Sequence, residues 1–298
     1  MSKSLKNDNL GRAKSKTQIK AQSQPPVNPF IQQLPAFYRR FLPVEVANLQ
    51  IVETKATCNN CIMTRPQNKN KRHYLPDLKC CTFQPFIPNY VVGALLQDPS
   101  ITDTAKQVFR DKIQRREYAL PVGMVAPVRY QLEFMSRKKT DFGQSESLLC
   151  SYYDTGSNNC SIWAYRGVVC TTFFCKSSYG SAGQQLWKSI SNYLSYLEMG
   201  LMEEALVQLD FSPRQVIELL DFLNRSDGTI KEQTSWVLER KKSERLWNFY
   251  FDEQEDFYKK CFHIINTMKV KDITELLGDT GEQLLQQVLQ QSQAVLKG

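Results

Sequence analysis

The chain has 298 residues, nine of them cysteines, and a formal net charge of +8. A chain of this length buries enough apolar surface to fold without disulfide bonds, and its cysteine content is well below the roughly 8–10% typical of small secreted disulfide scaffolds. We see neither a secretory signal nor a run of about 18 apolar residues, so we expect a cytoplasmic protein without a membrane span.

Much of the positive charge lies in the N-terminal segment, residues 1–28. This segment carries six lysine and arginine residues against one aspartate, so it contributes five of the eight net positive charges. It lacks the apolar spacing of a folded element, and we therefore predict a disordered basic tail over residues 1–28. We expect this tail to contact acidic surfaces weakly. No specific nucleic-acid binding is predicted, and a protein partner is possible but not identified.

Short helices and loops are predicted after the tail. A short helix is expected within residues 31–41, whereas residues 44–54 fit either a short helix or a strand. Residues 62–79 are polar and basic and contain two prolines, which indicates a loop. Two helices then follow, the first over residues 89–96 and the second over residues 100–116 with Thr102 or Asp103 as its N-cap.

The apolar spacing changes after Val125. Four apolar residues alternate with polar ones, namely Val128, Tyr130, Leu132 and Phe134. This period of two predicts a half-buried strand. Residues 148–153 are expected to pair with it as a hairpin, and residues 154–159 form a strong turn signal.

The second half of the chain is predicted to be mostly helical. Apolar residues at helical spacing predict helices over residues 184–209, 212–225 and 280–297, and either one or two helices over residues 235–268. We therefore expect an α+β fold that is predominantly α, with a cysteine-rich metal-binding region and a short β-hairpin packed against a C-terminal helical bundle. The expected units are the tail (1–28), a cysteine-cluster domain (29–180) and a helical region (181–298).

Eight of the nine cysteines are concentrated between positions 58 and 175, and Cys261 stands apart in a predicted helix. In order they are Cys58, Cys61, Cys80, Cys81, Cys150, Cys160, Cys170 and Cys175. A hydrophobic core gives no reason for such a concentration, whereas four thiolates are enough for tetrahedral zinc or an iron–sulfur cluster. The pattern favours a metal site over redox thiols or packing. His73 lies close in sequence, but a lone loop histidine is more often solvated.

The second half of this cysteine series carries a resemblance. The segment CSYYDTGSNNCSIWAYRGVVCTTFFC, from Cys150 to Cys175, resembles the CxxCxxCC family of YkgJ-type zinc- or iron-chelating cysteine-cluster proteins. In that family a Cys-Ser-Ile-Tyr stretch, an Arg-Pro pair and two further cysteines close the site. Here Trp163 replaces the tyrosine, and glycine follows Arg166 in place of the proline.

The first half of the family motif matches in order but not in spacing. Cys58, Cys61 and the pair Cys80-Cys81 correspond to it, yet the gap between Cys61 and Cys80 is much longer than in the family. The chain therefore resembles a divergent member.

The resemblance implies that all eight of these cysteines are candidate metal ligands and that Arg166 hydrogen-bonds near the thiolates. For Arg166 a surface salt bridge is the alternative. Eight thiolates cannot all bind one zinc ion, so either two sites exist or one cluster uses four cysteines. An iron–sulfur cluster, of the 4Fe-4S type, is the preferred cofactor and zinc the alternative.

Two functions are compatible with these residues. The first is a metal-binding protein with an accessory, redox or structural role. The second is a protein-modifying enzyme, because the flagellin lysine N-methylases carry a related cysteine cluster and transfer methyl groups to protein lysines. Against the enzyme, no glycine-rich nucleotide-binding loop is present, and the acidic stretch of residues 252–256 is typical of a solvated helix face. Catalytic residues are not identified.

Overall fold

The computed structural model describes residues 29–42, 44–53, 61–65 and 73–297. The predicted tail and Cys58 lie outside these ranges. Within them the fold is predominantly helical with a few short strands, which agrees with the expected α+β class. No described helix combines the length and the apolar character needed to cross a membrane.

Helices make up most of the described chain, and each described strand is very short. The α-helices are α1 (Pro29–Gln33), α2 (Ala36–Arg39), α3 (Val44–Ala47), α4 (Asn89–Gln97), α5 (Asp103–Arg115), α6 (Val128–Ser136), α7 (Val168–Thr172), α8 (Gly180–Gln208), α9 (Pro213–Leu220), α10 (Ile230–Thr234), α11 (Arg240–Trp247), α12 (Gln254–Thr267) and α13 (Val270–Lys297). The 3-10 helices are η1 (Ile62–Thr64), η2 (Glu146–Leu148), η3 (Trp163–Tyr165) and η4 (Asn248–Tyr250). The strands are β1 (Ile87–Pro88), β2 (Ala119–Leu120), β3 (Gly123–Met124), β4 (Tyr153–Asp154) and β5 (Asn159–Cys160).

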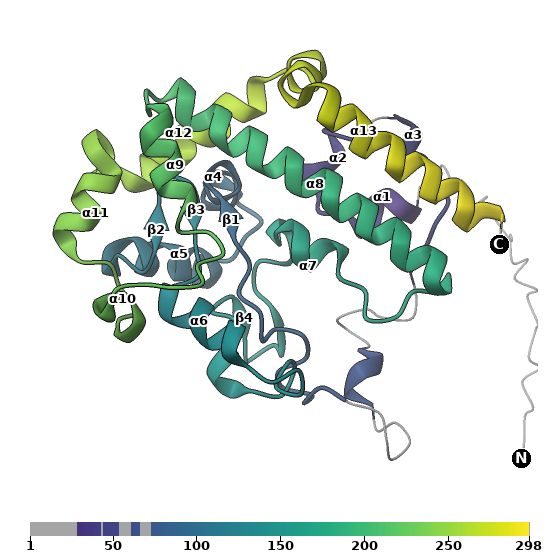
Figure 1. Ribbon diagram of the computed structural model, residues 1–298, viewed down its shortest axis with the longest axis horizontal. Coiled ribbons are helices and arrows are strands. Elements are labelled where there is room, and N and C mark those ends of the chain that lie inside the picture. The colour runs from purple at the N-terminus through teal and green to yellow at the C-terminus, as the bar shows by residue number, and fades with distance from the viewer. Residues whose placement is uncertain (1–28, 43, 54–60, 66–72, 298) are drawn as a thin grey trace, which may run out of the picture.

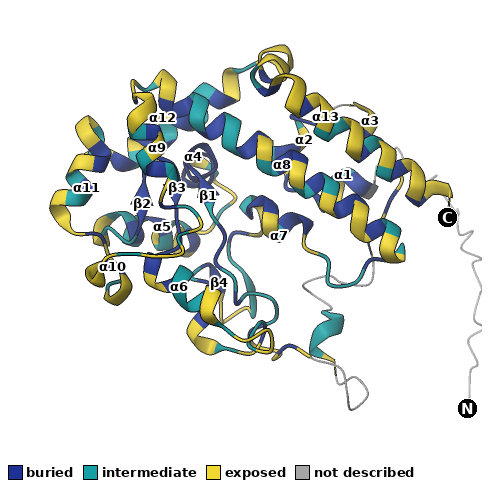
Figure 2. Cartoon of the chain, viewed as in Figure 1, coloured by how far each residue is buried: buried dark blue, intermediate teal, exposed yellow. Residues whose placement is uncertain are grey.

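Helix α4 lies in the core of the molecule (Figure 1). Residues 89–96 are all buried, so almost the whole of α4 is dark blue in Figure 2. Helix α12 packs so closely along it that a Cβ atom on Gly93 would lie 1.9 Å from the carbonyl oxygen of Tyr258. Because no side chain fits that gap, only glycine permits this approach.

A small antiparallel sheet in the order β1-β3-β2 leads into α4. Ile87 of β1 and Ala119 of β2 both lie opposite Met124 of β3. The carbonyl groups of β2 accept hydrogen bonds from the C-terminal half of the chain, because Trp247 Nε1 donates to Ala119 O (3.0 Å) and Tyr258 Oη donates to Leu120 O (2.8 Å). The sheet is thus tied to α11 and α12.

The long helices α8 and α13 lie side by side (Figure 1). Gly278, with φ +52°, breaks the helical geometry within α13. A continuous hydrophobic cluster extends from Phe30 to Val295 and includes residues on both sides of position 180. The expected division of the chain near that position stays a prediction.

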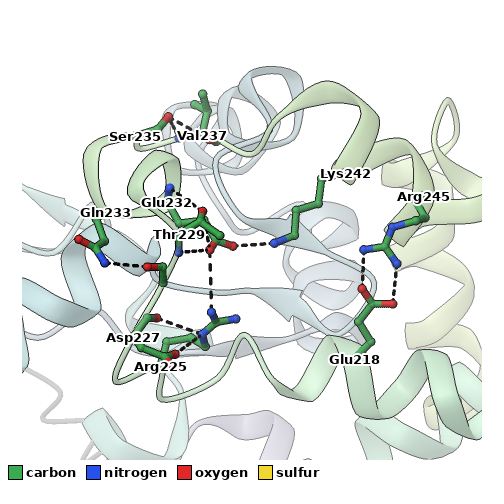
Figure 3. A network of polar contacts seen from close by, with 11 residues as sticks. Glu218, Arg225, Asp227, Thr229, Glu232, Gln233, Ser235, Val237, Lys242 and Arg245 are labelled. Carbon is green, nitrogen blue, oxygen red and sulfur yellow. Dashed lines mark hydrogen bonds and ion pairs between the residues drawn. The ribbon is translucent and has the colours of Figure 1, made fainter.

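Polar contacts fix the short helix α10 (Figure 3). The Glu232 carboxylate accepts hydrogen bonds from Thr229 N (2.8 Å) and from Lys242 Nζ (2.6 Å). Arg225 forms a further ion pair with it at 3.9 Å. Since Thr229 Oγ1 also accepts from Glu232 N, the two residues form a capping box at the start of the helix.

The sequence predicted several helices correctly. The helices expected over residues 89–96, 100–116 and 184–209 are α4, α5 and α8, and the Thr102 hydroxyl accepts from Ala105 N as the N-cap of α5. Residues 212–225 contain α9, which ends at Leu220. The helix predicted over residues 280–297 is the part of α13 that follows the kink at Gly278, and the part from Val270 to the kink was not predicted.

Three further predictions, which were open or approximate, can be compared with the structure. Residues 31–41 contain the end of α1 and all of α2. Within residues 44–54, for which the sequence allows a helix or a strand, the described residues 44–53 contain helix α3. Residues 235–268 contain two α-helices, α11 and α12, separated by η4.

The predicted strand over residues 128–134 is wrong, because this segment is helix α6. Its apolar residues belong to two opposite helix faces. Val128 and Leu132, one helical turn apart, pack into the main core, whereas Tyr130 and Phe134 join a second, smaller cluster. Two such pairs, offset from each other by half a turn, imitate the alternation of a strand.

The expected hairpin pairing is wrong as well. Residues 148–153 do not pair with α6; instead β4 pairs with β5, in the register Tyr153 opposite Cys160. The strong turn signal in residues 154–159 does connect these two strands. The hairpin therefore exists, but within the cysteine series.

Candidate metal centre

Five of the eight predicted ligands line a single cavity of about 420 Å³. These are Cys80, Cys81, Cys150, Cys160 and Cys170. They come from four separate places in the chain. Their meeting depends on how the loops, the β4–β5 hairpin and α7 fold against one another.

The backbone joins the Cys80-Cys81 pair to Cys150. A turn over residues 76–80 presents the pair, and Cys81 N donates to Leu78 O (3.0 Å). Cys150 N then donates to Cys81 O at 2.7 Å. Two cysteine-bearing segments that are far apart in sequence are thus fixed against each other by a main-chain hydrogen bond.

The β4–β5 hairpin places Cys160. The Asp154 carboxylate accepts from Gly156 N (3.0 Å) and Ser157 Oγ (2.5 Å), which closes the turn. Lys79, next to the cysteine pair, donates from Nζ to Asn158 O (2.5 Å). The hairpin that carries Cys160 is therefore held onto the loop that carries Cys80.

Helix α7 places Cys170 in its middle. The helix starts directly after Gly167, where a Cβ atom would lie 2.7 Å from Phe86 O. Val168 N donates to the buried Glu198 carboxylate of α8 (3.2 Å). This contact anchors the start of α7 to the core.

Three predicted ligands are not among the described residues that line the cavity. Cys175 Sγ lies 3.8 Å from the Tyr74 hydroxyl, and Tyr74 is a lining residue. Burial raises the pKa of Tyr74, and the nearby thiols of Cys175, Cys80 and Cys61 raise it further. Cys61, which precedes η1, therefore lies near the same site, whereas Cys58 lies outside the described residues.

A buried glutamate connects the two ends of the cysteine series. Glu53 precedes the segment that holds Cys58, and its carboxylate accepts from Ser177 Oγ (2.5 Å), Ser178 N (2.6 Å) and Trp187 Nε1 (2.8 Å). Ser177 follows closely after Cys175 in the sequence. The chain therefore enters and leaves the cysteine region at adjacent points.

Burial keeps the deepest thiols protonated. It raises the pKa of Cys150 to about 12, while Lys112 opposes this rise. Cys170 retains some solvent contact, but burial also raises its pKa, and the neighbouring thiols of Cys150, Cys80 and Cys160 add to the effect. Thiolates, not thiols, bind metals, so metal binding here must release protons.

Arg166 is buried rather than on the surface, with 7% of its area exposed. It lines the cavity and donates to Trp163 O and Gln33 O, both at 2.7 Å. Its charge also lowers the pKa of Cys170, against the effect of burial. Arg166 therefore lies beside the cysteines and donates hydrogen bonds to carbonyl groups.

The remaining candidates lie elsewhere. Cys261 is buried in α12 within the main core, as expected for a cysteine apart from the series. His73 and His263 are both exposed. The acidic stretch at the start of α12 forms ion pairs with Lys259 and Lys260, as a solvated helix face does.

Two cations that the sequence does not mark lie near the thiols. Lys112 of α5 is 3% exposed and pairs with Glu117, and its Nζ lies 5.9 Å from the ring centre of Tyr152. Arg137 lines the cavity directly. Both belong to stretches of several charged residues, which usually indicate a solvated surface, and no pattern in the sequence marks them as different.

The cavity brings thiols together without forming a finished coordination site. Among the described residues, no three His, Cys, Asp or Glu side chains are placed as ligands of one metal ion. The donor chemistry nevertheless suits a soft metal, since five thiols and no carboxylate are found among the described lining residues. Metal binding is coupled to folding, so a bound metal can draw such ligands together.

Comparisons with protein-family models, with curated proteins and with solved structures gave no match. The resemblance to the CxxCxxCC family accordingly stays a prediction.

Proposed function

We propose that this chain is a metal-binding protein whose cavity cysteines hold an iron–sulfur cluster or, as the alternative, zinc. The gathering of five cysteines around one cavity carries the proposal. Cys61 and Cys175 lie close enough to act electrostatically on Tyr74 of the same cavity. Four thiolates suffice for either group, so the cavity offers a sufficient donor set.

The surrounding charges support the same proposal. Four thiolates bring a large negative charge, which is costly in a buried site unless cations offset it. Arg166 and Lys112 both lower the pKa of cavity thiols, so both favour the thiolate form. A bound metal group supplies the remaining positive charge, and the protein then serves as an accessory, redox or structural component.

The test is anaerobic purification followed by iron, sulfide and zinc analysis and a visible spectrum. We expect brown protein with iron and acid-labile sulfide. Colourless protein with stoichiometric zinc would select the alternative metal, and protein without either would reject the proposal.

Two cysteine variants and a matched control test whether the metal binds in the cavity. Cys80→Ser and Cys170→Ser each remove one lining thiol, and both are expected to lose most of the metal. Cys261→Ala removes a thiol from the core outside the cavity and should keep the full content. Equal metal content in all three variants would place the metal elsewhere.

The enzyme alternative has weaker support. Lysine methylation requires a site for a cationic side chain, yet no carboxylate lies among the described lining residues, whereas two arginines do. A thermal shift on adding S-adenosylmethionine would favour the enzyme.

A further inference from the structure

The cavity has a second wall that is made of aromatic rings rather than cysteines. Phe83 and Phe134 meet edge to face, with ring centres 5.2 Å apart. Phe142 meets Phe173 at 5.8 Å and Tyr74 at 5.5 Å. All five residues line the cavity. Ligand sites for small organic molecules have this kind of apolar, ring-lined wall.

Arg137 joins the two groups of rings. Its guanidinium carbon lies 3.4 Å from the ring centre of Phe134 and 5.9 Å from that of Phe142. One of its terminal nitrogens donates to Phe134 O. The side chain thus lies along the aromatic wall, with its charge held inside the cavity lining.

Arg137 also has an unsatisfied donor. Its Nε atom is buried and has no hydrogen-bond partner within the described part of the chain. Buried polar groups in proteins are nearly always paired, and the exceptions commonly mark sites for solvent or a ligand. A guanidinium prefers carboxylate, sulfonate or phosphate oxygens as acceptors.

The charged residues that line the cavity determine which ligand charge it favours. Arg137 and Arg166 line it, and no aspartate or glutamate is found among the described lining residues. Arg166 lies beside the thiols, but Arg137 lies on the aromatic wall, so a cationic ligand that packs on these rings would meet a guanidinium group and is disfavoured. An anionic group is favoured.

We propose that the cavity binds a small aromatic anion, whose ring system packs on Phe134 and Phe142 and whose anionic group accepts hydrogen bonds from Arg137. None of the groups that contact this ligand is a cysteine, so the inference goes beyond the proposed metal site and does not require it.

The size and opening of the cavity suit such a ligand. The cavity volume of about 420 Å³ lies within the range of roughly 300–1,000 Å³ that is usual for small-molecule sites. Three lining residues, Trp163, Val169 and Phe173, are 44–46% exposed and form an apolar opening to solvent. A flat organic molecule can enter there beside the cysteines.

The test uses 8-anilinonaphthalene-1-sulfonate, a fluorescent aromatic anion, and its neutral counterpart N-phenyl-1-naphthylamine. Both are titrated into the full chain and into Arg137→Gln, Arg137→Lys and Arg129→Gln. Arg129 is the matched control, because it lies on helix α6, which ends directly before Arg137, but stacks on Trp236 (5.1 Å), outside the cavity.

Arg137→Gln is expected to bind the sulfonate at least about tenfold more weakly, since a charge-assisted hydrogen bond is lost. Its binding of the neutral dye should change less than about twofold, which also shows that the cavity remains folded. Arg137→Lys should lie between the two, and Arg129→Gln should match the unmodified chain.

Several results would overturn the inference. These are unchanged sulfonate binding in Arg137→Gln, an equal loss of both dyes, or no binding of either dye by the unmodified chain. Metal content is measured in the same samples. Dye binding that depends on Arg137 in metal-free protein would support this inference while rejecting the metal proposal, so the two can fail separately.

Discussion

Glu198 is a buried carboxylate on α8 whose protonation should affect stability. It accepts hydrogen bonds from Tyr38 Oη and Val168 N, yet burial raises its pKa to about 8. Between about pH 4.5 and 8 the folded protein keeps a proton that the unfolded chain releases. Stability therefore falls as the pH rises through this window.

Glu198→Gln should remove that dependence, because an amide oxygen accepts the same two hydrogen bonds without ionising. Relative to the unmodified chain, the variant should gain up to about 1.4 kcal/mol per pH unit between about pH 4.5 and 8. Urea unfolding at pH 5, 6.5 and 8 measures this difference. Parallel stability curves for the two proteins would show that Glu198 does not titrate in this range.

Gly93 is a second residue whose substitution should change the stability of the protein. A Cβ atom there would lie 1.9 Å from Tyr258 O, so Gly93→Ala should force α4 and α12 apart and cost about 3 kcal/mol or more. Gly200→Ala in α8 is the control, because its Cβ would meet Leu277 at an ordinary 3.4 Å. That change should stabilise the protein by up to about 1 kcal/mol. A similar melting temperature for both variants would contradict the close packing.

At the scale of single elements, the stability of helix α10 depends on the carboxylate of Glu232. Glu232 receives the capping hydrogen bonds of Thr229 and the Lys242 ion pair. Burial would raise its pKa, but these contacts outweigh burial and lower it to about 2. Its stabilising effect is therefore complete above about pH 4.5 and is lost as the pH falls towards about 2.

Glu232→Gln is expected to lower the free energy of unfolding by about 1–2 kcal/mol at pH 7. The loss should shrink as the pH falls from about 4.5 to 2, because the glutamate itself becomes neutral. Denaturant titrations at pH 7, 4 and 2.5 test this. Glu239→Gln, which removes an exposed ion pair with Lys231, is the control and should change stability little.

Elements were predictable from sequence where one face of the helix is apolar and where caps are strong. Thr102 and Ser212 correctly mark the starts of α5 and α9. Helix α6 was not predictable, since Val128 and Tyr130 face different clusters and together imitate a strand. Apolar periodicity therefore misidentifies a helix when two opposite faces pack into different clusters.

For the whole molecule, the cysteine series was the most informative part of the sequence. It predicted the shared position of Cys80, Cys150 and Cys170, because clustered thiols have few other uses in a core. It did not predict Arg137, which stands in the charged stretch Arg137-Lys138-Lys139. Whether one arginine of such a stretch turns inward depends on rings brought together by tertiary structure.

The charge of the whole chain gives another prediction, which concerns residues 1–28. They hold five of the eight net positive charges, so deleting them should weaken retention on a heparin column and reduce the dependence of retention on salt. A chain in which the order of residues 1–28 is scrambled should behave like the unmodified protein. Unchanged retention after deletion would mean that residues 29–298 carry the binding surface.

The close contact between α4 and α12 also has a consequence for synthesis on the ribosome. Gly93 is made long before Tyr258, and because translation adds about 5–20 residues per second, α4 waits on the order of 10 seconds or more for this partner. During that time its apolar surface stays partly uncovered, although almost none of it is exposed in the finished fold. Chaperone binding to the nascent chain is therefore expected in the interval between the emergence of α4 and that of α12.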